Sequence, residues 1–160
     1  MPTLSPTIRE RIIREIVTSL GASNVDLYGL QDWKSVQRGR VDYEPGEVPF
    51  ITVNPGQDTA TRTQYGRQTM KMEVGVIAIY PTDGPAVTSD ASPSELAEII
   101  LGTLIQAVMA GTTALKALID DLAYTRGGVG DYPDETQQMT VVEAYFTVTY
   151  RIAKGDPYNQ

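Results

Sequence analysis

From Val142 to Ile152 the chain reads VEAYFTVTYRI, in which apolar and polar side chains alternate strictly. Successive side chains of a β-strand point to opposite faces, so this alternation predicts a strand with one buried face and one wetter face. The face expected to be buried carries Val142, Ala144, Phe146, Val148, Tyr150 and Ile152. Such a strand needs neighbouring strands and a covering layer, and the rest of the sequence supplies candidates for both.

Further strands are predicted on both sides of the middle of the chain. Residues 69–80 alternate in the same way and predict one long strand. The run VPFITV at 48–53 predicts another, which the turn-forming residues 54–56 (Asn-Pro-Gly) are expected to end. Weaker patterns at 35–43 and 124–126 predict two short strands.

Two helices have clear start signals. Thr7 and Glu10 fit a reciprocal capping box, and the isoleucine-rich pattern that follows predicts an amphipathic helix up to Gly21. Residues 92–95 (Ser-Pro-Ser-Glu) give the same kind of start to a helix that ends at Gly111. A short third helix is predicted from the helical spacing of Leu115, Leu118, Ile119 and Leu122.

The order of these elements predicts an α+β domain with a mostly antiparallel sheet of about four strands. The N-terminal helix and the central helix pair are expected to cover it. No internal repeat or change of composition divides the chain, so we expect residues 1–160 to form one domain. A chain of this length buries enough surface to be stable without a disulfide or a metal.

The chain contains no Cys and no His among its 160 residues. This excludes disulfides, the usual zinc and copper ligands, cysteine nucleophiles and Ser-His-Asp triads. We therefore expect no catalytic residues, no metal and no cofactor. No apolar run is long enough for a membrane span and no signal-peptide pattern is present, so we expect assembly in the cytosol and no membrane partner.

Charge is unevenly distributed along the chain. Residues 1–80 carry nine Lys/Arg and nine Asp/Glu, whereas residues 81–160 carry four and eleven, so the second half supplies the net charge of −7. This sign disfavours binding to phosphate backbones as a main function. We interpret five residues of this half as an acidic surface: Asp120, Asp121, Asp131, Asp134 and Glu135.

Three alternative functions for the second half of the chain have less support from the sequence. The glycine-rich residues 127–130 resemble a phosphate-binding loop, but a β-patterned segment follows them instead of the helix that such loops require. The acidic turn at 131–135 could surround calcium, yet its spacing matches no EF-hand, which favours a solvated turn. Asp120 and Asp121 are expected at a helix end and in different directions, which excludes a paired acid–base couple.

The polar stretch 57–68 is the first candidate for a protein contact. Apart from Tyr65 it has almost no large apolar residue, so we expect a long, mobile excursion. Arg is enriched at interfaces and Tyr65 could be an aromatic anchor, whereas the alternative is a solvated loop. Lys71 and Glu73 lie on a strand that we expect to be exposed and able to pair with the edge of another subunit. The full candidate interface, for subunit or tube, comprises Arg38, Arg40, Asp58, Arg62, Tyr65, Arg67, Lys71 and Glu73.

The order of these segments resembles the tail terminator (tail completion) proteins of long-tailed bacteriophages. The resemblance covers nearly the whole chain and rests on element order and length rather than on a catalytic signature. It is carried by the N-terminal amphipathic helix, the Val-Pro-Phe-Ile-Thr-Val strand, the polar stretch 57–68, the strand at 70–80, the Ser-Pro-Ser-Glu-Leu helix and the C-terminal strand ending Thr-Tyr-Arg-Ile.

This resemblance implies a structural virion protein at the head-proximal end of the tail, assembled in the host cytoplasm. Such proteins form a homohexameric ring that binds the last ring of the tail tube protein and stops its polymerisation. The ring also presents a docking surface to the head-completion or connector protein. DNA passes through the central hole without specific binding, and an acidic lumen would repel it, which is our hypothesis for the acidic surface.

Two other functions are compatible with the sequence. One is a head-closure protein, a neck adaptor or another minor tail protein. The other is a small cytosolic ligand-binding or enzymatic α+β domain that uses carboxylates and tyrosines. That second alternative requires a deep pocket with convergent polar groups and a titratable residue of shifted pKa.

Overall fold

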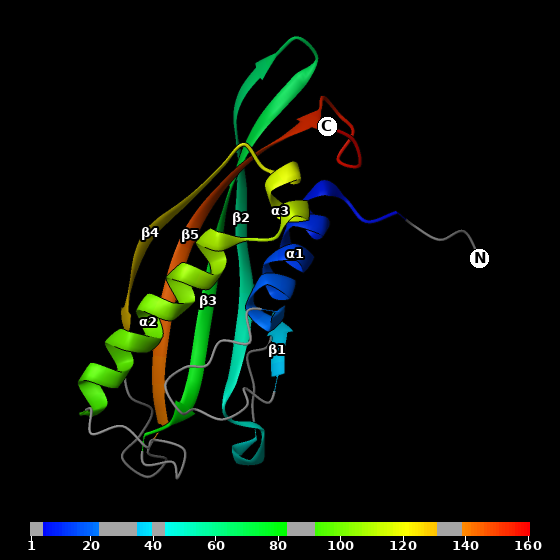
Figure 1. The fold of residues 1–160 in the computed structure, drawn as a ribbon. Coiled ribbons are helices and arrows are strands. Elements are labelled where there is room, and N and C mark those ends of the chain that lie inside the picture. Colours follow the sequence, from blue (N-terminus) through cyan, green and yellow to red (C-terminus); the bar gives the residue numbers. More distant parts are fainter. Residues whose placement is uncertain (1–4, 23–34, 40–43, 83–91, 131–138) are drawn as a thin grey trace.

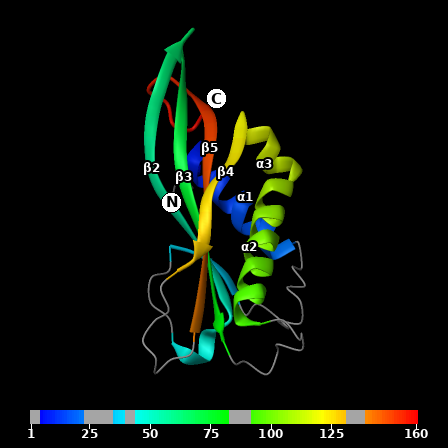
Figure 2. The same ribbon diagram turned by 90° about the vertical axis from the view of Figure 1, so that its left-hand side faces the viewer.

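The computed structural model describes residues 5–22, 35–39, 44–82, 92–130 and 139–160. Figure 1 shows the arrangement of its elements, and Figure 2 shows α1, α2 and α3 on one side of the sheet. In chain order the elements are α1 (Ile8–Ala22), β1 (Ser35–Arg38), the 3-10 helix η1 (Pro45–Glu47), β2 (Phe50–Gln64), β3 (Arg67–Pro81), α2 (Pro93–Ala110), α3 (Thr113–Leu118), β4 (Asp121–Val129) and β5 (Met139–Ala153).

The strands form one sheet in the order β1-β2-β3-β5-β4. Only β1 and β2 are parallel neighbours, and the other pairs are antiparallel. The α+β class and the mostly antiparallel sheet are therefore confirmed, with five strands where about four were expected. The predicted strand at 35–43 is seen at its start, and residues 40–43 lie outside the described part of the chain.

The main core lies between this sheet and the helices. Along β3 and β5 every second side chain faces the helices, and opposed pairs such as Val74 with Phe146 and Val76 with Ala144 are completely buried. Burying one such large apolar side chain contributes roughly 1.5–3 kcal/mol. On the opposite face, a small second cluster forms around Val48, Phe50 and Ile79 near one end of the sheet.

The two capping boxes that the sequence predicts are formed to different degrees. At α2 the Ser92 hydroxyl accepts from the Glu95 N–H at 3.3 Å, and the Glu95 carboxylate accepts from the Ser92 N–H at 2.7 Å. At α1 the Thr7 hydroxyl accepts from the Glu10 N–H at 3.2 Å, but the Glu10 carboxylate turns to Arg14 and Arg38. The predicted capping box is confirmed at α2 and is only half formed at α1.

The expected excursion at 57–68 is wrong, because β2 continues through Asn54-Pro55-Gly56 to Gln64 and turns directly into β3. Pro55 lies beyond the last residue of β2 that pairs with β1, at an edge that has no strand partner among the described residues and where a missing N–H is tolerated. The pairing register with β3 shifts between Pro55 and Asp58 and again between Ala60 and Arg62. Such irregularities allow the strand to continue through the turn-forming residues instead of ending there.

The region after α3 also differs from the prediction. Helix α3 ends at Leu118, and Leu122 packs on the core from β4, opposite Val148. Strand β4 is longer than the expected 124–126 segment and includes Gly127 and Gly128. Asp121 therefore begins β4 and Asp120 directly precedes it, so neither lies on a helix.

Candidate functional site: the β2–β3 hairpin

The β2–β3 hairpin reaches beyond the helical layer, and we call its residues 57–72 the arm. Figure 1 shows the arm rising past the ends of α1 and α3. Strand β1 pairs with β2 only as far as Val53, so within the described residues the outer edge of β2 has no strand partner along the arm. The polar stretch chosen from the sequence is thus a projecting β-hairpin.

The tip of the arm is a two-residue turn. Gln64 pairs with Arg67, and the two residues between them, Tyr65 and Gly66, have φ angles of +49° and +74°. Positive φ at both central positions is the type I′ geometry, which prefers Asn-Gly or Gly-Gly. Tyr65 is 94% exposed, so the aromatic ring stands in solvent at the outermost point of the hairpin.

Three cations share one face of the arm. Arg67 and Lys71 project from the same side of β3, and Arg62 joins them because it pairs with Thr69. This face is opposite to the helices, since the alternate residue Met72 is buried in the core. All three cations are exposed and make no ion pair within the described part of the chain.

Lys154 adds a further exposed cation beside the tip. Its backbone N–H donates to the Gly66 carbonyl oxygen at 2.8 Å, which brings the end of β5 next to the turn. Like the three arm cations, Lys154 has no ion-pair partner among the residues that the structure describes. The tip of the arm is therefore basic in a chain whose net charge is −7.

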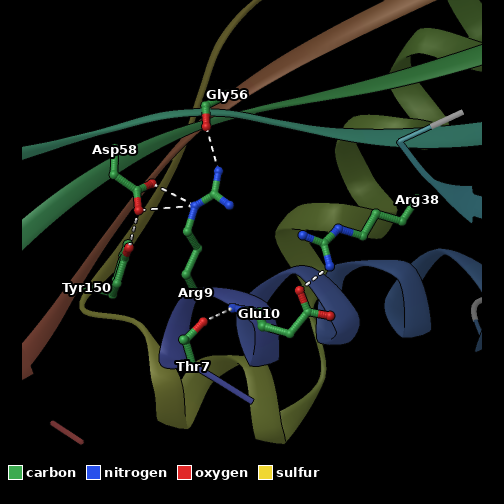
Figure 3. Close-up of polar contacts among 7 residues, drawn as sticks. All are labelled: Thr7, Arg9, Glu10, Arg38, Gly56, Asp58 and Tyr150. Atoms are coloured by element: carbon green, nitrogen blue, oxygen red, sulfur yellow. Dashed lines mark hydrogen bonds and ion pairs between the residues drawn. The ribbon is translucent and has the colours of Figure 1, made fainter. Parts of the chain in front are cut away.

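Asp58 holds the base of the arm to the helical layer, as Figure 3 shows. Its carboxylate accepts from Arg9 Nε at 3.1 Å and from the Tyr150 hydroxyl at 2.8 Å. Arg9 also donates to the Gly56 carbonyl oxygen at 2.6 Å. Burial, and then the hydrogen bond to Asp58, raise the pKa of Tyr150. Asp58, a candidate contact residue, is thus engaged inside the molecule.

Arg38 is also engaged inside the molecule. Its guanidinium pairs with the Glu10 carboxylate and joins the end of β1 to α1 (Figure 3). Burial opposes the charge of Glu10, but the hydrogen bonds and charges of Arg14 and Arg38 outweigh it and lower the pKa of Glu10. Arg40 lies outside the described residues.

Lys71 and Glu73 do not lie on an edge strand as we expected, because β3 is flanked by β2 and β5 along its length. Glu73 makes a weak ion pair with Arg126, in which a guanidinium nitrogen lies 3.5 Å from a carboxylate oxygen. The Arg126 guanidinium also lies over the Tyr145 ring, with its central carbon 3.7 Å from the ring centroid. These residues line the face opposite to the helices. They offer side chains for contact, and not an open backbone edge.

The acidic candidates are only partly described. Asp120 binds the Arg151 guanidinium through both carboxylate oxygens, and Asp121 is exposed. Three of the candidates, Asp131, Asp134 and Glu135, lie outside the described residues. Within those residues, no three acidic side chains are grouped closely enough to hold a metal ion.

Sequence reasoning selected Arg62, Tyr65, Arg67 and Lys71, and the structure brings all four to the arm. It missed the turn at Tyr65 and Gly66, for which the single Gly after an aromatic residue was the available signal. It also missed the contact of Arg9 with Asp58, because a pair 49 positions apart leaves no local pattern.

No protein-family model matches the sequence, and a search of curated proteins finds no match. Among solved structures, the fold is similar to a chain described as the virion of a native gene transfer agent (GTA) particle. The TM-score is 0.45 with 12% sequence identity, over 86% of this chain and 92% of that chain. None of the helices in the described part of the chain is long and apolar enough to cross a membrane.

Proposed function

We propose that this chain is a structural virion protein that caps the end of a phage tail tube as a ring. In this role it stops tube polymerisation and provides the docking surface for the head connector, and it acts through protein contacts without catalysis. The observation that carries the proposal is the arm, a projecting hairpin on which an exposed aromatic residue and exposed cations can be reached by a neighbouring protein. These cations have no ion-pair partner among the described residues.

The distribution of polar groups supports a contact role. Some of the described charged side chains bridge elements, as Arg9 does with Asp58, whereas the three cations of the arm are exposed. The depression along the arm, whose lining includes Gln57, Lys71, Glu73 and Thr147, is open to solvent. An enzyme of the small-ligand class would instead gather its polar groups in an enclosed pocket.

The test is the mass and shape of the purified chain with and without tail tubes. We expect light scattering coupled to size exclusion, and negative-stain images, to show a ring or a cap confined to tube ends. A monomer that ignores tubes but binds head connectors would favour a head-closure or neck position. A monomer that ignores both would contradict a role in virion assembly.

A further inference from the structure

Tyr65 combines an unfavourable backbone conformation with a side chain that is almost fully exposed. Its φ of +49° lies in the left-handed region, where a bulky side chain is an outlier and Asn or Gly is preferred. The residue is 94% exposed, so packing against the described part of the chain does not offset this strain. Strained residues of this kind cluster at functional sites, and an aromatic residue is a common anchor of protein interfaces.

The cations near Tyr65 are exposed, as Tyr65 is. Arg62, Arg67 and Lys71 lie on one face of the arm, exposed and without an ion pair in the described chain. The acidic residue of the arm, Asp58, is held by Arg9 and Tyr150 on the other face. Glu73 lies just beyond the arm on the same face as the cations, where it contacts Arg126. The arm therefore presents positive charge that its own carboxylates leave uncompensated.

We propose that the arm is a docking element for an acidic protein surface. Tyr65 fills an apolar pocket of the partner, and Arg62, Arg67 and Lys71 bind carboxylates around that pocket. The identification of this partner as the end of a tail tube rests on the proposed function, whereas its chemistry follows from the arm alone.

An acidic protein fits the arm better than a nucleic acid does. Proteins that bind nucleic acid usually carry a broad basic face, whereas the cations of the arm form a small patch on one hairpin. The arm offers one aromatic ring at its tip, where single-strand binding uses successive stacking rings. One aromatic anchor ringed by charges is instead the pattern of a protein contact.

The Tyr65→Asn variant separates folding from binding. Asn followed by Gly66 is the preferred type I′ turn, so we expect its thermal midpoint to rise by about 2–4 °C. The same variant should lose about tenfold in affinity for tail tubes, a typical loss for an aromatic anchor. Tyr158→Asn, at another exposed tyrosine, is the control and should leave tube binding unchanged.

The charges are tested with labelled poly-L-glutamate and a labelled DNA duplex in fluorescence anisotropy. We expect the full chain to prefer poly-L-glutamate, and the double variant R62E/R67E to lose about tenfold in affinity for it. Lys116→Glu, an exposed charge reversal on α3, is the control and should bind as the wild type does.

The outcomes are distinct. Binding of poly-L-glutamate through the arm without binding to tubes would keep this inference and remove the tube as the partner. A preference for duplex DNA that R62E/R67E abolishes would overturn the acidic protein in favour of a nucleic acid. If Y65N binds tubes as the wild type does, or if R62E/R67E behaves like K116E, the docking role of the arm is wrong.

Discussion

At the scale of single residues, Asp58 links three elements. Its carboxylate accepts from Arg9 of α1 and from Tyr150 of β5, while its own backbone belongs to β2. A hydrogen bond to a charged group contributes about 1.5–3 kcal/mol, and the partial exposure of Arg9 lowers its share. The orientation of the arm relative to α1 therefore depends on a few polar atoms at its base.

Removing the Tyr150 hydroxyl tests this link. We expect Y150F to lower the free energy of unfolding at neutral pH by about 1–2 kcal/mol, because Asp58 loses one donor. Burial and then Asp58 raise the pKa of Tyr150 above its ordinary value of 10. The contribution of this group is complete below that value and is lost as the pH rises above it, because the unfolded chain ionises first.

Urea unfolding between about pH 7 and about pH 11 measures both effects. The stability difference between wild type and Y150F should be largest at neutral pH and should shrink above about pH 10. The remaining tyrosines are common to both proteins and cancel in this comparison. A difference that stays constant with pH would contradict the hydrogen bond.

Glu10 gives the opposite pH dependence. Burial opposes its charge, but Arg14 and Arg38 lower its pKa below the ordinary value of 4.5. Its contribution to stability is complete above that value and is lost as the pH falls through the lower folded value. We expect wild type to be more stable than E10Q at neutral pH, and the difference to vanish in acid. Thermal melts at a series of pH values check this, with Glu98→Gln, at an exposed glutamate of α2, as the matched control.

At the scale of elements, periodic segments were predictable and the polar ones were not. Strands β3 and β5 and helices α1 and α2 each carry a regular apolar stripe, and the structure confirms them. The distal half of β2 reads QDTATRTQ and has no such stripe. Its strand conformation comes from the backbone ladder with β3, which no local pattern reveals.

The candidate site follows the same division. The cations and Tyr65 identified this segment as a candidate contact surface, because charged side chains are rarely buried in a core. That the cations share one face of a hairpin depends on the strand register and on the irregularities of β2. The internal partners of Asp58 and Arg38 come from α1, far away in the sequence, and only the folded chain brings them together.

Strand β4 offers a matched test of close packing. A Cβ added at Gly127 would lie 2.6 Å from the Glu143 carbonyl oxygen, whereas one at Gly128 would meet nothing within 4 Å. We expect G127A to destabilise the protein by about 1–3 kcal/mol, because backbone must move. G128A should be neutral or slightly stabilising. Equal denaturation midpoints for the two variants would contradict the close approach of β4 and β5.

At the scale of the whole molecule, one apolar cluster joins the helices and the sheet. It includes buried residues from α1, α2, α3, β2, β3 and β5, such as Ile12, Ile100, Leu115 and Phe146. Unfolding of any one of these elements would expose a large apolar area of the sheet and the helices. The arm is different, because its side chains beyond Asp58 lie mostly outside this cluster.

This distribution predicts how the chain unfolds. Because the helices and the sheet share one cluster, we expect a single cooperative transition in urea, with far-UV circular dichroism and the near-UV tyrosine signal reporting the same midpoint. Variants that disturb contacts inside the fold and variants of the exposed arm cations should then have different effects on this transition. Y150F and G127A should shift the midpoint of that one transition, whereas R62E/R67E should leave it in place, since exposed charges contribute little to stability. Two separate transitions would mean that the helices and the sheet do not form one cooperative unit. A destabilised R62E/R67E would mean that these cations support the fold rather than a contact with another protein.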